Sequence, residues 1–195
     1  MQLVRHRRIP ALLASLYLSL LVPTATIGAT PEALAKITIK NFGAINDAYF
    51  RGAQPKGHDF ADLAALGVRT VIDLTRDGDP TEQGIVEKAG MRFVRIPLTT
   101  TSAPPAAAVE QFLAIVNDPA RQPVFVHCQG GRHRTGVMTA IYRLTHDSWS
   151  ADRAFDEMKR FEFEKGFVSH NTLKQFVYGF YEKLAAKADE TAARR

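Results

Sequence analysis

The feature that most constrains the fold is a short apolar run followed at once by a glycine-containing loop and a helical pattern. Residues 124–126 (Val-Phe-Val) predict a buried strand, and the apolar spacing that begins at Thr135 predicts a helix. Between them the chain reads His127-Cys128-Gln129-Gly130-Gly131-Arg132-His133-Arg134. A strand, a loop and a helix in this order point the loop amides at a helix N-terminus, where the helix dipole favours an anion such as phosphate.

Strand-like and helical segments alternate along the chain, which predicts an α/β domain with a mostly parallel central sheet flanked by helices. The predicted strands are residues 37–39, 49–50, 68–74, 92–96 and 124–126. The predicted helices surround residues 60–66, 81–89, 104–116, 135–144, 154–161 and 171–184, the last capped by Asn171. Because ligands bind at the carboxyl ends of parallel strands, the loops over residues 75–80 and 98–103 are expected to complete the site with the Cys128 loop.

Residues 1–29 have the layout of a secretory signal peptide. Arg5, Arg7 and Arg8 precede a short apolar core, and small residues follow it. The sequence therefore predicts an exported protein, periplasmic or secreted, with a folded domain over 30–187 and a flexible tail over 188–195. The alternative is a membrane anchor formed by an uncleaved N-terminal segment.

Without residues 1–29 the chain holds 22 basic and 20 acidic residues, because that segment carries three arginines and no acid. A charge so close to balance does not indicate a nucleic-acid partner. No stable membrane contact is expected once the signal is cleaved. Cys128 is the chain's one cysteine, which excludes an intrachain disulfide and a CxxC metal site. No metal and no cofactor are expected.

The residues of the loop suit covalent phosphoryl chemistry. A free thiol titrates near ~8.5, but a helix dipole, converging amides and Arg134 should lower the pKa of Cys128 and make it a nucleophile. The guanidinium of Arg134 can hold two phosphoryl oxygens at once, and the Thr135 hydroxyl can assist the sulfur as a leaving group. The loop from Gln129 to His133 should wrap the phosphate, whereas His127 should orient the loop. The members of this phosphate-binding set are Gln129, Gly130, Gly131, Arg132, His133 and Arg134.

His127-Cys128, five further residues, then Arg134-Thr135-Gly136 resembles the signature of cysteine-dependent protein tyrosine and dual-specificity phosphatases. Other stretches are similar to the plant-and-fungal atypical dual-specificity phosphatases and their bacterial relatives: residues 41–43, 49–52, 66–72 and 122–124. The resemblance implies a dual-specificity phosphatase fold and a two-step reaction through a phospho-cysteine, without metal. It also implies that the substrates are phosphoproteins or small polyanionic phosphoesters such as inositol pyrophosphates.

One departure concerns the general acid, which such enzymes carry as an Asp on the loop that here spans residues 98–103. This loop reads Leu-Thr-Thr-Thr-Ser-Ala and holds no acid. The substitutes considered are Asp77, Asp79, His133 and the more distant Glu164. Since leaving groups of low pKa need little protonation, the missing acid favours phosphoanhydrides, acidic phosphoesters and aryl phosphates.

The sequence thus predicts a cysteine phosphatase acting on phosphorylated proteins. Three alternatives stay open: a phosphatase of inositol pyrophosphates or other non-protein phosphoesters, a phosphate-binding module with weak turnover, and a rhodanese-like sulfurtransferase. The ending Arg134-Thr135-Gly136 fits the last of these poorly. Away from the loop, Arg51 is expected to form a buried ion pair with Asp73.

Overall fold

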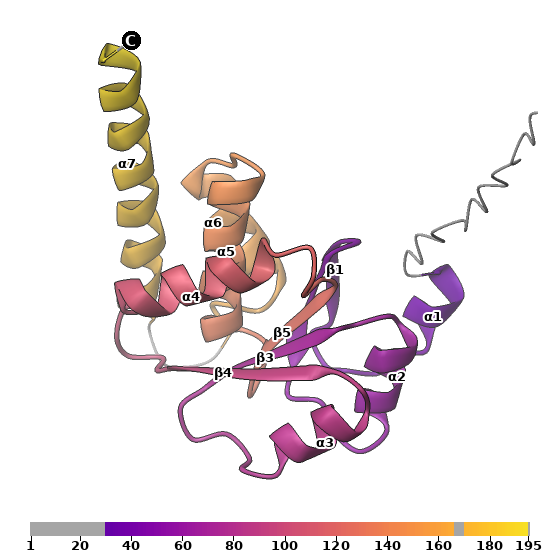
Figure 1. Cartoon of the computed structure of the whole chain (residues 1–195). Helices are drawn as coiled ribbons and strands as arrows, with labels where there is room; N and C mark the ends of the chain where they lie inside the picture. The colour runs from indigo at the N-terminus through magenta and orange to yellow at the C-terminus, as the bar shows by residue number, and fades with distance from the viewer. Residues whose placement is uncertain (1–29, 166–169, 195) are drawn as a thin grey trace, which may run out of the picture.

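The computed structural model describes residues 30–165 and 170–194, and within them five strands form one sheet in the order β1-β2-β5-β3-β4 (Figure 1). Strands β2, β5, β3 and β4 are parallel, and only the edge strand β1 runs antiparallel to its neighbour β2. The strands are β1 (Gly43–Asn46), β2 (Tyr49–Ala53), β3 (Thr70–Thr75), β4 (Arg92–Leu98) and β5 (Val124–Cys128). The predicted α/β class with a mostly parallel sheet is confirmed.

Seven helices accompany the sheet in the described residues. They are α1 (Pro31–Ala35), α2 (Asp59–Ala65), α3 (Glu82–Lys88), α4 (Ala106–Val116), α5 (His133–His146), α6 (Ala151–Arg160) and α7 (Asn171–Ala193). Helix α7 extends well away from the sheet in Figure 1. No helix of the described residues is both long enough and apolar enough to cross a membrane.

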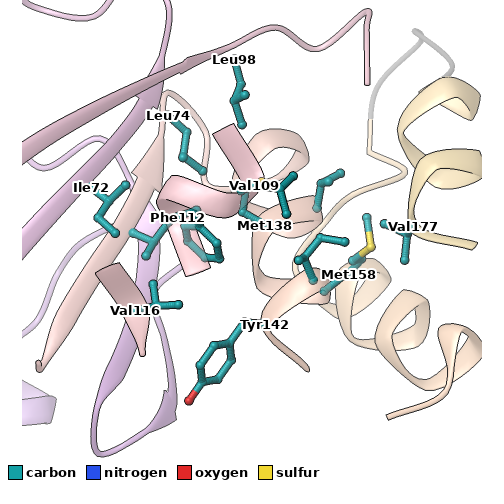
Figure 2. Packing of buried hydrophobic residues seen from close by; sticks show 14 of the residues in the cluster. Ile72, Leu74, Leu98, Val109, Phe112, Val116, Met138, Tyr142, Met158 and Val177 are labelled. Atoms are coloured by element: carbon teal, nitrogen blue, oxygen red, sulfur yellow. The ribbon is translucent and has the colours of Figure 1, made fainter. Parts of the chain in front are cut away.

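Two hydrophobic cores lie against the sheet. The larger one joins β-strand residues such as Ile72 and Leu74 to Phe112 of α4, Met138 of α5 and Val177 of α7 (Figure 2). The smaller one joins Phe50, Val71 and Phe125 to residues of α2 and α3. Because both faces of the sheet are covered, β5 is buried along its whole length, which explains its continuous apolar run.

The structure corrects four local predictions. Residues 37–39 form no strand, although Ile39 is buried in the smaller core. Asn171 is the first helical residue of α7 and His170 precedes it as the N-cap, so Asn171 is not the cap. Helix α6 ends at Arg160, before the predicted Phe161. The predicted flexible tail is helical as far as Ala193 and exposed, because its alanine, lysine and glutamate residues favour helix. The predicted signal peptide, residues 1–29, lies outside the described residues.

Candidate active site

The loop with the nucleophile candidate leaves the sheet at its centre. Strand β5 ends at Cys128 and α5 begins at His133, so the intervening residues turn at the N-terminus of a fourteen-residue helix. β5 lies between β2 and β3, with Ala53 level with Cys128 and Asp73 level with His127. The loops after β3 and β4 leave the same edge of the sheet, because these strands run parallel to β5.

Two side chains from the N-terminal part of the chain hold the loop through one carbonyl. The guanidinium of Arg51 and the side-chain amide of Asn41 both donate to the carbonyl oxygen of Gly131. With this carbonyl held beneath the loop, the neighbouring amides can turn toward an anion. Gly131 has φ +65°, and a Cβ there would lie 2.5–2.6 Å from the backbone of Gly52 and Ala53.

The predicted Arg51–Asp73 ion pair is therefore wrong. Arg51 is completely buried, donates to the loop, and lies 3.9 Å from the ring centroid of Phe161. Burial lowers the pKa of Arg51 to about 10, while nearby anionic groups that include Cys128 act against this shift. The side chain thus stays charged at neutral pH, below the loop that is to bind an anion.

The environment of Cys128 favours the thiolate. Burial alone would raise the pKa of this thiol. The hydroxyl and amide of Thr135, the charge of Arg134 and the amide of Gly130 outweigh burial, so the pKa of Cys128 is lowered. The sequence predicted this direction, and the structure agrees with it.

Arg134 faces open space beside the loop. Its Nη1 makes one long hydrogen bond of 3.5 Å to the carbonyl of Leu98, and its buried Nε has no partner among the described residues. Arg134 and Gln129 together line two adjoining depressions of about 320 and 310 Å³. The first depression is also lined by Gln54, Lys56, Thr75, Asp77, Gly78 and Asp79, and the second by Arg76, Asp77, Leu98, Thr99, Thr100 and Thr101.

Two predicted phosphate-binding side chains are engaged elsewhere. Arg132 is bound to Glu162, with its Nε 2.9 Å and its Nη2 2.8 Å from Oε2. The ring of His133 packs 3.6 Å from that of His170 and edge-on to Phe163. Burial and the neighbouring His170 lower the pKa of His133 to about 4, so the ring is neutral at pH 7. Both side chains thus have partners within the protein, and their part in phosphate binding stays a prediction.

A buried polar cluster lies beneath the loop and supports His127. His127 Nε2 is 2.9 Å from Glu82 Oε1, and its Nδ1 is 3.9 Å from Asp73 Oδ1. Three donors this close, within 4.8 Å of one another, could in principle hold a metal ion. However, the guanidinium of Arg95 already lies 2.7 Å from Asp73 and 3.8 Å from Glu82, and it supplies the positive charge that these carboxylates require. The cluster therefore packs as a buried ion-pair network beneath the loop, and the orienting role of His127 stays a prediction.

The candidates for a general acid differ sharply in their surroundings. Asp79 accepts from the amide and the hydroxyl of Thr81, and these bonds lower its pKa and favour the charged form. The neutral ring of His133 has no proton to spare for a leaving group at pH 7. Glu164 is exposed after α6 and lines neither depression. Asp77 is exposed and lines both.

Comparison with known proteins identifies the family. The chain matches the family described as "DSP-PTPase phosphatase fused to NAD+ Kinase" over residues 39–175. The protein therefore belongs to the DSP-PTPase family and is a cysteine-type phosphatase of the tyrosine and dual-specificity class. This confirms the resemblance and the enzyme class predicted from the loop.

Individual relatives differ in their named substrates. Inositol diphosphatase DSP2 of Oryza sativa subsp. japonica is 29% identical over 126 residues, which are 62% of this chain and 61% of the relative. Dual specificity protein phosphatase TpbA of Pseudomonas aeruginosa is 28% identical over 120 residues, which are 62% of this chain and 54% of the relative. This chain thus spans about half to three-fifths of the length of these curated relatives.

Solved structures support the same fold. The core catalytic domain of the PP-IP phosphatase SIW14 from S. cerevisiae superposes with a TM-score of 0.62 at 26% identity, covering 77% of this chain and 94% of that one. The crystal structure of P. aeruginosa TpbA gives 0.61 at 26% identity, covering 72% and 84%. Relatives with inositol pyrophosphate names and relatives with protein phosphatase names therefore share this architecture.

Proposed function

We propose that the protein hydrolyses phosphate monoesters on proteins through a phospho-cysteine on Cys128. The thiolate attacks phosphorus, an S–P bond forms, and the P–O bond to the leaving group breaks. Arg134 and the loop amides hold the phosphoryl oxygens. Water then attacks the phospho-cysteine, which releases inorganic phosphate and restores the thiolate, with Thr135 donating to the departing sulfur. The observation that carries this proposal is the lowered pKa of Cys128 beside an Arg134 that has no carboxylate partner in the described residues.

The charges around the site favour a substrate with one phosphoryl group. The lining of the two depressions has three basic side chains, Lys56, Arg76 and Arg134, against two acidic ones, Asp77 and Asp79. Arg132 is neutralised by Glu162 and His133 is uncharged. A densely phosphorylated inositol would need more free cations than these. Among protein monoesters we expect phosphotyrosine to react fastest, because a phenol leaves at a pKa of ~10, below that of an aliphatic alcohol.

The test is phosphate release by the full-length protein from matched phosphotyrosine, phosphoserine and phosphothreonine peptides and from an inositol pyrophosphate. We expect the phosphotyrosine peptide to give the highest kcat/KM. Faster release from the inositol pyrophosphate would overturn the protein assignment while leaving the cysteine mechanism intact. The same assay on Cys128→Ser separates this phosphatase from a contaminating one.

A second candidate is the cleavage of inositol pyrophosphates. Two observations favour it: relatives such as rice DSP2 carry this activity in their names, and the loop over residues 98–103 lacks an acid. A phosphoanhydride leaving group is already a weak base, so it departs without much protonation. The comparison of peptides with inositol pyrophosphate above decides between the two candidates.

We also propose that residues 1–29 direct export and that the mature protein begins near Thr30. Support comes from the basic residues at the start of this segment, its short apolar core and the small residues before the expected cleavage site. N-terminal sequencing of the protein from a periplasmic fraction should give a start near Thr30. Recovery of soluble cytoplasmic protein that begins at Met1 would refute export.

A further inference from the structure

We propose that Asp77 is the general acid of the reaction, in place of an acid on the loop over residues 98–103. The assignment rests on the phosphatase function proposed above. Asp77 is the acidic residue that lines both depressions with Arg134 and Gln129, whereas Asp79 lines only one. In the proposed mechanism Arg134 binds the phosphoryl group, so a carboxyl that lines both depressions beside Arg134 is placed to reach the leaving oxygen.

The other acids near the loop are occupied. Asp79 is held as a carboxylate by two hydrogen bonds from Thr81, at 2.8 Å from the amide and 2.6 Å from the hydroxyl. Glu162 binds Arg132 and Lys165. By contrast, Asp77 makes no hydrogen bond or ion pair with any side chain of the described residues, so its carboxyl is free to meet a substrate.

The backbone that carries Asp77 is held in place from below. Arg95 Nη2 donates to the carbonyl of Asp79 at 2.8 Å, and Arg95 Nε donates to the buried carboxylate of Asp73 at 2.7 Å. Gly78 rests on this pair so closely that a Cβ would collide with Thr75 and Asp73. Asp77 thus lies between the buried strand β3 and Gly78, where the close packing leaves no room for a side chain. A solvated loop tip would need neither restraint.

The same cluster also supports the nucleophile loop. Asp73 and Glu82 both pair with Arg95, which holds the loop of Asp77. The same two carboxylates lie close to His127, the neighbour of Cys128: Asp73 is 3.9 Å from Nδ1 and Glu82 is 2.9 Å from Nε2. The nucleophile and the proposed acid are therefore positioned by one set of buried side chains. Such a shared support fixes the distance between a nucleophile and an acid, which a general acid requires.

The proton balance of this step is simple. When Cys128 attacks, the P–O bond breaks and its electron pair stays with the leaving oxygen. Asp77 gives its proton to that oxygen and becomes a carboxylate. In the second step the carboxylate takes a proton from the attacking water, so that phosphate leaves and both groups are restored.

The experiment measures kcat/KM for aryl phosphates of graded phenol pKa with the full-length wild type, Asp77→Asn, the rival candidate Asp79→Asn and the matched control Asp189→Asn, which changes an exposed aspartate of α7. We expect a shallow dependence on phenol pKa for wild type and Asp189→Asn. Asp77→Asn should lose about 100- to 10,000-fold on phenyl phosphate, the usual contribution of a general acid. It should lose little on dinitrophenyl phosphate, and this remaining activity shows that the variant is folded.

Equal slopes for wild type and Asp77→Asn, or a steep slope in Asp79→Asn alone, would overturn the assignment. Inhibition by inorganic phosphate gives a second readout, because binding does not need the acid. Asp77→Asn should keep the wild-type inhibition constant. A wild type that hydrolyses none of the aryl phosphates would refute the proposed function itself, a result distinct from an unchanged slope.

Discussion

The two sides of the site are built in different ways. The side that holds phosphorus is buried: Cys128, Gly131 and Thr135 are inside the protein, and Arg51 and Asn41 fix the loop from below. The side that we assign to the leaving group is more open and consists of the loops over residues 76–80 and 98–103, in which most residues are exposed or partly exposed. If both proposals hold, phosphoryl binding uses a whole buried structural unit, whereas protonation of the leaving group depends on one side chain at the rim.

Cys128→Ser should reduce turnover to background while leaving phosphate or vanadate binding in place. A hydroxyl is far less acidic than a thiol, but the amides and Arg134 still bind the anion. Phosphate release and vanadate binding on the same sample provide the two readouts. Substantial hydrolysis by this variant would contradict the covalent mechanism.

Arg134→Lys should lower kcat by about a hundred- to a thousandfold, the effect of losing a charge-stabilising donor. Lysine keeps the charge but cannot hold two phosphoryl oxygens with a planar fork. Steady-state kinetics with an aryl phosphate measure the loss. As a control, Arg132→Lys should cost much less, because the Arg132 side chain binds Glu162. Equal losses of kcat in the two variants would show that Arg134 contributes no more to catalysis than Arg132 does.

Gly131→Ala should destabilise the protein by about 1–3 kcal/mol, because φ +65° is strained for alanine and the Cβ meets the backbone of β2. Gly130→Ala is the matched comparison, since a Cβ there meets only the side chain of Arg132, 3.8 Å away or more. Denaturant unfolding of both variants tests the difference. Similar free energies of unfolding would mean that Gly131 is not tightly enclosed.

The neutral His133 should make the protein less stable in acid. Its folded pKa of about 4 lies below the ordinary 6.5, so between these values the unfolded chain binds a proton that the folded chain does not. Stability is therefore lost as pH falls from about 6.5 to 4. For a half-buried ring we expect on the order of 1–2 kcal/mol after solvent screening. His133→Gln should remove this part of the pH dependence, and the exposed control His58→Gln should keep it.

The sequence predicted the buried side well because strand, loop and helix follow one another directly. The run to Cys128 and the helix after it predicted the local structure and the lowered thiol pKa, and the nucleophilic role of Cys128 stays a prediction. The sequence could not reveal what holds the loop, since Arg51 and Asn41 lie about 80 and 90 residues away in the chain. In the sequence, Asn41 and Arg51 stood out only because they lie in two short stretches, one with Gly43 and one with Tyr49-Phe50, that match the family pattern weakly.

The exposed side was harder to predict because it depends on which partners surround each charged residue. Arg132 and His133 lie inside the loop, and the sequence assigned both to phosphate. Glu162, 30 residues from Arg132, and His170 instead bind their side chains. Asp77 and Asp79 look equivalent in sequence. The structure separates them by the bonds from Thr81 to Asp79 and by the depressions they line, two for Asp77 and one for Asp79.

The most direct test of the central claim is to look for the phospho-cysteine itself. The full-length protein is mixed with an aryl phosphate, quenched in acid within the first turnover and mapped by peptide mass spectrometry. The account predicts one phosphoryl group on the peptide that contains Cys128, formed at the rate of phenol release and absent from Cys128→Ser. Phenol release with no label on Cys128, or a label on another residue, would contradict it.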